Sequence, residues 1–128
     1  MRLLWVTVFL STLSVSSFSA AQIDDTEKLT NAATILGKSS ASFEVCGIDT
    51  SRSLPLLKKL LQACKATDYQ KNQAVEAFTL GRIQRRAEVE GKNCPWTQDH
   101  AQKNYDDGLE YLKSVADVAD NGGTPNCN

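Results

Sequence analysis

Four cysteines constrain the fold of this chain more than any other feature of its sequence. They are Cys46, Cys64, Cys94 and Cys127. An even number of cysteines in a small exported domain is typical of a disulfide framework, and no C-x-x-C spacing indicates a redox pair or a zinc knuckle. The count therefore predicts two disulfides, while the spacing alone leaves all three pairings open.

The first 21 residues have the layout of a secretory signal peptide. Arg2 supplies an early positive charge, an apolar run follows over residues 3–10, and Ser19 and Ala21 put small side chains at positions −3 and −1. The apolar run is too short for a membrane-spanning helix, which needs about 20 residues. We therefore expect cleavage after Ala21 and one domain over residues 22–128, periplasmic or secreted, with no stable membrane insertion.

Apolar residues recur at three- and four-residue steps in four segments, which predicts an all-α domain, a small four-helix bundle stapled by two disulfides. Gly47 is expected to end the first helix in a left-handed conformation, Pro55 suits the first helical position of the second, and Thr97 is expected to cap the fourth. The apolar positions are Leu29, Ala32, Ala33, Leu36 and Phe43 in the first helix, Leu56, Leu57, Leu60, Leu61 and Cys64 in the second, and Ala101, Tyr105, Leu109, Leu112, Ala116 and Ala119 in the fourth.

The third helix, expected from Thr67 or Asp68 to about Glu90, has two apolar faces instead of one. At 100° per residue, one side carries Ala74, Val75 and Phe78, and nearly the opposite side carries Leu80, Ile83 and Ala87. A bend near Gly81 or a cover on both sides would explain this pattern. Because one glycine is a weak cause for a bend, we expect this helix to be the central helix of the bundle.

Candidate catalytic residues are few, because the chain contains one histidine. A cysteine nucleophile needs a base within hydrogen-bond reach, and His100 follows Cys94 closely enough to be considered. Two disulfides would instead use all four cysteines. The chain has no G-x-S-x-G serine motif, no glycine-rich phosphate loop and no zinc-site spacing. We therefore expect no catalytic residue, no cofactor and no metal.

The most concentrated charge lies in the segment GRIQRR of the third helix. Arg82, Arg85 and Arg86 stand at i, i+3 and i+4 and therefore share one patch. Guanidinium groups bind carboxylates and phosphates in a bidentate manner, so the patch is a candidate site for an anion or an acidic partner. The alternative is that these arginines pair with Asp106 or Glu110 of the fourth helix, or are simply solvated.

Two segments of the chain carry a family likeness. ATILGKSSASFEVCG, residues 33–47, has a Leu-Gly pair followed by a Cys-Gly end, and AFTLGRIQRRAEVEGKNC, residues 77–94, has Ala-Phe-x-x-Gly followed by a bulky helix and a cysteine. In both respects the chain resembles a family of small exported helical proteins from alphaproteobacteria, whose function is unknown. It departs from that family in Arg85, where an aromatic residue is usual, and in the additional Cys64 and Cys127.

The resemblance implies a disulfide pairing that the residues alone leave open. It implies that Cys46 pairs with Cys94, which leaves Cys64 to pair with Cys127. The second disulfide would then tie the C-terminal tail to the second helix.

Composition excludes one class of partner, and the motifs favour another. The formal net charge is −1 at pH 7, so the chain lacks the basic surface of a nucleic-acid-binding protein. A stapled helical domain with one arginine patch favours a non-catalytic interaction protein, such as a periplasmic adaptor, an inhibitor or an immunity-like binder, whose partner is another protein of the cell envelope. The alternatives are a carrier that holds a small apolar ligand between its helices, or an enzyme that uses Cys94 and His100.

Overall fold

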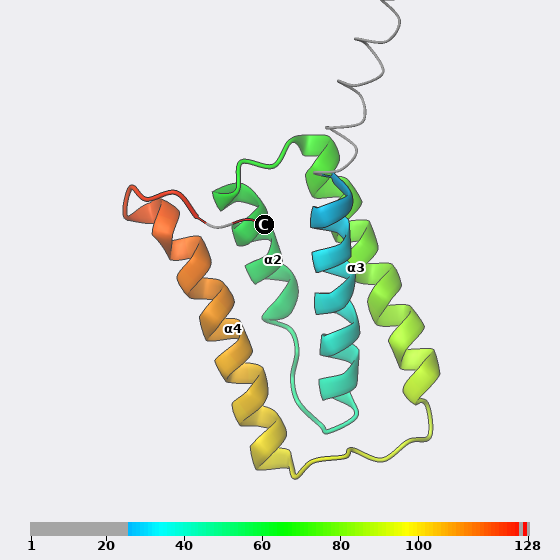
Figure 1. Ribbon diagram of the computed structural model, residues 1–128. Coiled ribbons are helices and arrows are strands. Elements are labelled where there is room, and N and C mark those ends of the chain that lie inside the picture. The colour runs from blue at the N-terminus through cyan, green and yellow to red at the C-terminus, as the bar shows by residue number, and fades with distance from the viewer. Residues whose placement is uncertain (1–25, 126, 128) are drawn as a thin grey trace, which may run out of the picture.

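Four helices make up the described part of the computed structural model, which covers residues 26–125 and 127. They are the first helix, residues 26–44, followed by α2 (Ser53–Ala63), α3 (Asp68–Val89) and α4 (Gln98–Asp120). Each helix runs antiparallel to the one before it (Figure 1). The described residues contain no strand, which confirms the predicted all-α bundle. The expected signal peptide and its cleavage site after Ala21 lie outside the described residues.

The helix ends follow local signals in the sequence. The side chain of Thr67 accepts a hydrogen bond from the backbone N–H of Gln70 (3.2 Å), whose side-chain oxygen accepts one from the backbone N–H of Thr67 (2.9 Å). This capping box starts α3. Thr97 Oγ1 accepts from the backbone N–H of His100 at 3.2 Å and starts α4. Gly47, with φ of 75°, follows the first helix in the left-handed conformation. These three predictions are confirmed, whereas the placement of Pro55 at the first helical position is wrong, because α2 begins two residues earlier at Ser53.

The apolar core is divided into two clusters, and α2 contributes to both. The first cluster joins the first helix, α2 and α3, and its buried residues are Ala33, Leu57, Leu61, Ala74 and Phe78. The second joins the end of the first helix to α4, with Leu56 of α2 packed against it, and its buried residues are Cys46, Ile48, Ala101, Tyr105 and Leu109. The stripes predicted for the second and fourth helices therefore face the core. Ala32, predicted to belong to the first stripe, is exposed, whereas Ala33 of the same predicted stripe is fully buried, because adjacent residues point about 100° apart around a helix.

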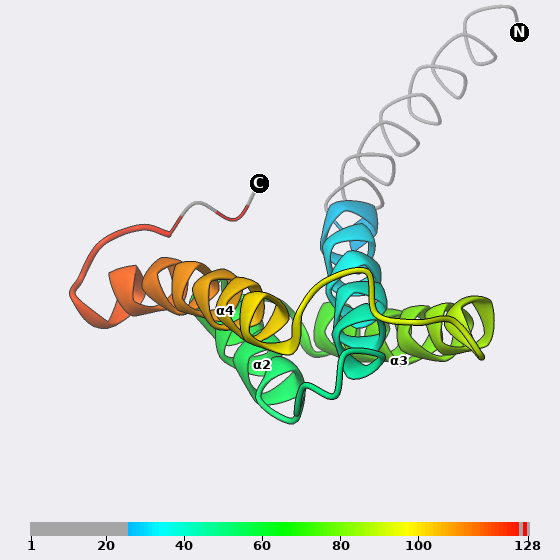
Figure 2. The same ribbon diagram turned by 90° about the horizontal axis from the view of Figure 1, so that it is seen from below.

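Helix α3 lies at one edge of the bundle, so the prediction that it is the central helix is wrong. Helix α2 contacts both α3 and α4, whereas α3 and α4 do not contact each other within the described residues. Figure 2 shows α3 and α4 on opposite sides, with α2 and the first helix between them. The face with Ala74 and Phe78 packs inward, but Leu80 and Ile83 on the other face are 59% and 56% exposed. The described residues thus cover only one of the two predicted apolar faces.

Two glycines bring the first helix and α3 unusually close together. A Cβ atom at Gly37 would lie 2.1 Å from the carbonyl oxygen of Phe78, and one at Gly81 would lie 2.7 Å from the carbonyl oxygen of Thr34. Both contacts are with backbone, which no side-chain rotation can relieve. Because α3 runs unbroken from Asp68 to Val89, Gly81 serves this close approach and not a break in the helix.

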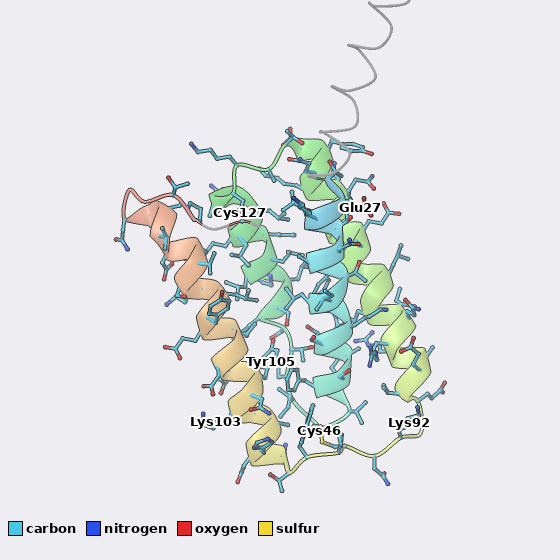
Figure 3. The ribbon with its side chains drawn as sticks, in the orientation of Figure 1. Glu27, Cys46, Lys92, Lys103, Tyr105 and Cys127 are labelled. Carbon is cyan, nitrogen blue, oxygen red and sulfur yellow. A yellow bond between two sulfur atoms is a disulfide. The ribbon has the colours of Figure 1, made fainter. Side chains whose placement is uncertain are left out.

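Three buried hydroxyl groups connect the helices where the two clusters meet. Ser40 Oγ lies 2.9 Å from the carbonyl oxygen of Leu36 and 2.8 Å from Ser53 Oγ, which lies 2.7 Å from the hydroxyl oxygen of Tyr105. Ser40 and Ser53 have no exposed surface, and Tyr105 is 3% exposed. Figure 3 shows Tyr105 reaching from α4 toward the middle of the bundle. Because each hydroxyl can donate one hydrogen bond and accept another, this row of hydrogen bonds gives all three buried hydroxyl groups a partner.

Two disulfides hold the bundle at opposite ends, as the labelled Cys46 and Cys127 show in Figure 3. Cys46–Cys94 joins the end of the first helix to the loop before α4, with 4.8 Å between the Cα atoms. Cys64–Cys127 joins the C-cap of α2 to the C-terminal tail, with 5.9 Å between the Cα atoms. The predicted two-disulfide bundle is confirmed, and the pairing is the one that the family resemblance implied.

Candidate binding surface on helix α3

The arginine cluster of α3 is organised around Glu44, the last residue of the first helix. Arg82 donates its Nε–H to Glu44 Oε1 at 2.8 Å, and Arg86 donates its Nε–H to Glu44 Oε2 at 2.8 Å. The hydroxyl of Thr50 also donates to Glu44 Oε1 at 2.8 Å. Each carboxylate oxygen therefore accepts from a guanidinium, and this Arg82–Glu44–Arg86 network ties the first helix to α3.

Glu44 is held in its ionised form by these neighbours. Partial burial raises the pKa of its carboxyl, but hydrogen bonds from Arg86, Thr50 and Arg82 outweigh burial and lower the pKa to about 2. Since one carboxylate faces two guanidinium groups, the network keeps an excess of positive charge. Of the two guanidinium groups, that of Arg86 is the more exposed, with 51% of its side-chain surface exposed against 34% for Arg82.

Arg85, the third arginine of the predicted patch, does not join the network. Its Nε lies 3.1 Å from Glu88 Oε2, three residues along α3, in an ion pair without hydrogen-bond geometry. The predicted patch of Arg82, Arg85 and Arg86 is therefore divided, because two of its members bind the first helix and the third pairs within α3.

The alternative prediction, that these arginines pair with Asp106 or Glu110 of α4, is wrong. Asp106 instead accepts hydrogen bonds from the guanidinium of Arg52 and from the side-chain amide of Gln102, the latter at 3.0 Å. The physical reason is the position of α3, because the first helix and α2 separate it from α4.

Beside the arginines, α3 presents an apolar surface that no described residue covers. We define the outer face of α3 by five residues that lie within about 60° of one another around the helix: Tyr69, Glu76, Leu80, Ile83 and Ala87. Tyr69, Leu80 and Ile83 are 65%, 59% and 56% exposed. A groove of about 360 Å³ borders this face on the side of the first helix, where Thr30 and Thr34 line it. Contiguous apolar surface is typical of interaction sites, whereas singly scattered apolar residues are not.

The cysteine–histidine alternative has no free thiol in this structure. Cys94 is bonded to Cys46, and no cysteine of the chain is free. His100 lies in the first turn of α4, where its ring centroid is 6.5 Å from that of Trp96. Trp96 is 42% exposed and also packs against Phe43, at a centroid distance of 5.9 Å. His100 therefore lies beside the aromatic side chain of Trp96, and the nearby Cys94 has no free thiol for it to activate.

The carrier alternative requires an apolar cavity between helices. The groove between α2 and α4 measures about 370 Å³ and is lined by Arg52, Leu56, Asp106, Leu109, Glu110 and Lys113. Four of its six lining residues have charged side chains, whereas small-molecule sites are lined mainly by apolar and aromatic side chains with few polar groups. Among the residues that the structure describes, no group of three or more His, Cys, Asp or Glu side chains is placed to hold a metal ion. Over the same residues, no helix has the length and apolar character needed to cross a membrane.

Sequence reasoning missed Glu44 as the partner of the arginines. A signal for it exists, because Glu44 lies two turns after Gly37 and so on the same side of the first helix. Arg82 directly follows Gly81. If the two helices approach each other at Gly37 and Gly81, Glu44 and Arg82 come close together. The sequence alone does not show that the helices approach each other at these glycines.

The outer face of α3 and the Arg82–Glu44–Arg86 network must be interpreted from this chain's own residues. Comparisons with protein-family models, curated proteins and solved structures give no match.

Proposed function

We propose that this protein is an exported, non-catalytic interaction protein, and that it binds a partner protein of the cell envelope through the outer face of α3. The observation that carries the proposal is the exposure of Leu80 and Ile83 on adjacent turns of an edge helix, at 59% and 56%. Full burial of an exposed Leu or Ile side chain stabilises an assembly by roughly 1.5–3 kcal/mol. A partner that covers both side chains therefore gains a useful part of its binding free energy from this face.

The support behind this face favours a rigid binding surface. Close backbone contacts at Gly37 and at Gly81 hold α3 against the first helix. The Arg82–Glu44–Arg86 network joins the same two helices nearer the C-terminal end of α3. A surface that is already ordered loses less conformational entropy when it binds. Such a surface suits an adaptor, an inhibitor or an immunity-like binder.

The disulfides support the exported location. Disulfides form and persist in the periplasm or outside the cell and are rare in the cytosol. Together with the signal-like first 21 residues, the two disulfides favour a periplasmic or secreted protein.

Site-specific photocrosslinking tests this proposal. The full chain is expressed in the organism that makes it, with a photoreactive residue in place of either Ile83 or Tyr111, which is a 69% exposed residue on α4. We expect a discrete adduct with another envelope protein from position 83, lost when Leu80→Asp is added, and no such adduct from position 111. Equal adducts from both positions, or none from position 83, would contradict the proposal.

A further inference from the structure

A groove of about 280 Å³ lies between α2 and α3, and it contains no residue of the outer face of α3. We call it the α2–α3 groove. Its lining comes from neighbouring turns of the two helices and consists of Lys58, Leu61 and Gln62 of α2 and Lys71, Asn72 and Val75 of α3. Leu61 belongs to the core and is 3% exposed, so the groove has an apolar floor and a polar border.

The polar side chains of the border have no partner among the described residues. They are the side chains of Lys58, Gln62, Lys71 and Asn72, and none of them forms a hydrogen bond or an ion pair there. The neighbouring Lys59 differs, because its Nζ lies 2.6 Å from Asp117 Oδ1 on α4. Helix α2 contains no acidic residue that could neutralise Lys58. The ammonium and carboxamide N–H groups of the border can therefore donate to an external acceptor.

The charge of the α2–α3 groove is unbalanced, unlike that of other grooves in the described part of the chain. Two of those grooves are lined by as many acidic as basic residues: Arg52, Lys113, Asp106 and Glu110 between α2 and α4, and Arg86, Lys92, Glu44 and Glu90 at the C-terminal end of α3. The groove beside the outer face of α3 has Glu76 as its charged residue. The α2–α3 groove instead has two lysines and no acidic residue in its lining. It is thus a cationic groove on a chain whose formal net charge is −1.

The charged residues at the turn between the two helices do not change this excess. Lys65 follows α2, and Asp68 begins α3 three residues before Lys71. Neither Lys65 nor Asp68 lines the groove, and Asp68 forms no ion pair with Lys71. Because their charges have opposite signs, the two positive charges of the groove remain even when both are counted.

We propose that the α2–α3 groove binds the phosphate group of a small phosphate monoester. Such a group carries nearly two negative charges at about pH 7, which matches the two ammonium groups, and its three terminal oxygens accept hydrogen bonds. The carboxamide groups of Gln62 and Asn72 supply further donors. Leu61 and Val75 would contact the apolar part of the ester. Since ligand pockets usually measure about 300–1,000 Å³, this groove fits a small ligand.

The expected affinity is low, because water and salt screen charges that border an open groove. We expect a dissociation constant on the order of 1 mM for butyl phosphate at low salt. Inorganic phosphate should bind roughly three- to tenfold more weakly, since it has no apolar chain to cover Leu61 and Val75.

Nuclear magnetic resonance tests the site residue by residue, on oxidised ¹⁵N-labelled protein purified from the periplasm after expression of the full chain. Butyl phosphate is added at constant pH and ionic strength, and butanol serves as the ligand without an anion. The side-chain NH₂ signals of Gln62 and Asn72 report directly on hydrogen bonds to the phosphate. We expect both to shift with one saturation curve when butyl phosphate is added, and to stay in place with butanol.

A pair of double variants separates a site from a general attraction to lysines. Lys58→Gln with Lys71→Gln should raise the dissociation constant at least about tenfold, because both charges of the groove are lost. Lys38→Gln with Lys113→Gln makes the same change in net charge on the first helix and α4, and should alter the dissociation constant less than about twofold. Since Lys58 and Lys71 have no partner among the described residues, their replacement should leave the melting temperature unchanged.

Cosedimentation with vesicles identifies the source of the phosphate. The vesicles contain phosphatidylcholine alone, or phosphatidylcholine mixed with phosphatidic acid, whose headgroup is a phosphate monoester. Binding to the mixed vesicles that the groove variant loses and the control variant keeps identifies a lipid headgroup. Binding of butyl phosphate without binding to either vesicle identifies a soluble ester. Both results support the phosphate site.

Two results overturn the proposal. One is that neither butyl phosphate nor the mixed vesicles bind. The other is that the groove variant and the control variant bind equally well, which would mean that any surface lysine serves as well as Lys58 and Lys71. Because the groove shares no residue with the outer face of α3, neither result affects the photocrosslinking test of the proposed function.

Discussion

Replacing Gly37 by Ala tests the closest contact in the structure. A Cβ at this position would lie 2.1 Å from the carbonyl oxygen of Phe78 and 3.1 Å from the backbone nitrogen of Arg82. Carbon and oxygen atoms in favourable contact are about 3.5 Å apart, so the first helix and α3 must separate by on the order of 1 Å. Because the obstructing atoms belong to the backbone of another helix, the strain cannot be relieved by a rotamer change.

The expected cost follows from two opposing terms. Overpacking of this kind costs about 3 kcal/mol, while Ala in place of Gly inside a helix contributes about 1 kcal/mol of stability. The net destabilisation for Gly37→Ala is therefore about 2 kcal/mol. For a domain of this size, that corresponds to a decrease in melting temperature of roughly 10 °C. Gly81→Ala, whose Cβ would lie 2.7 Å from the Thr34 carbonyl oxygen, should show a smaller decrease.

Gly108 provides the matched control, because a Cβ added there meets no atom within 4 Å. The same Gly→Ala change in α4 should therefore raise the melting temperature by roughly 5 °C, through helix propensity alone. Thermal unfolding followed by circular dichroism on the oxidised protein measures all three variants. If Gly37→Ala and Gly108→Ala shift the melting temperature in the same direction, the close approach of the first helix and α3 is refuted.

Three further predictions concern the interactions that hold the helices together. Glu44→Gln should cost roughly 1–2 kcal/mol at pH 7, after allowance for the partial exposure of Arg86. The pKa of Glu44 is lowered to about 2 in the folded state, so the contribution of its ionised carboxylate to stability is complete above the unfolded-state pKa of about 4.3 and is lost as the pH falls toward 2. The melting temperatures of wild type and variant should therefore converge as the pH is lowered. A constant difference down to pH 2 would argue against the network. Ser53→Ala should destabilise the protein by about 2–3 kcal/mol and Tyr105→Phe by only about 1 kcal/mol in urea unfolding. The reason is that Ser53 bonds to two hydroxyl groups, those of Ser40 and Tyr105. The reverse order would show that these three hydroxyl groups are not joined by continuous hydrogen bonds. Joint replacement of Cys64 and Cys127 by Ser should lower the free energy of unfolding by up to about 4 kcal/mol for a separation of 63 residues, and an unchanged urea midpoint would mean that the tail adds nothing.

The helix ends and most inward-facing residues could be predicted because their causes are local. The reciprocal bonds of Thr67 and Gln70 involve residues three apart, and the cap of Thr97 acts on His100 at the same spacing. Apolar periodicity likewise needs only the geometry of one helix. These features therefore do not depend on which helices are neighbours.

The partners of the arginines could not be predicted, because they depend on which helices are neighbours. Arg82 and Glu44 are 38 residues apart in sequence, and the chemistry of Glu44 is no different from that of the expected partners Asp106 and Glu110. What selects Glu44 is the backbone contact at Gly37 and Gly81, which places the first helix beside α3. A single sequence shows that two glycines are present but not that each lies against the backbone of the other's helix.

Helix α3 shows why an apolar pattern does not by itself identify the core of a single chain. Its sequence has two apolar faces, and the structure buries Phe78 on one while leaving Leu80 and Ile83 exposed on the other. The apolar periodicity of a helix indicates which side chains favour burial, but it does not indicate whether the same chain or another chain buries them. For α3 the first helix and α2 provide cover on one side only. The exposed second face of α3 is therefore the surface that we propose a partner protein covers.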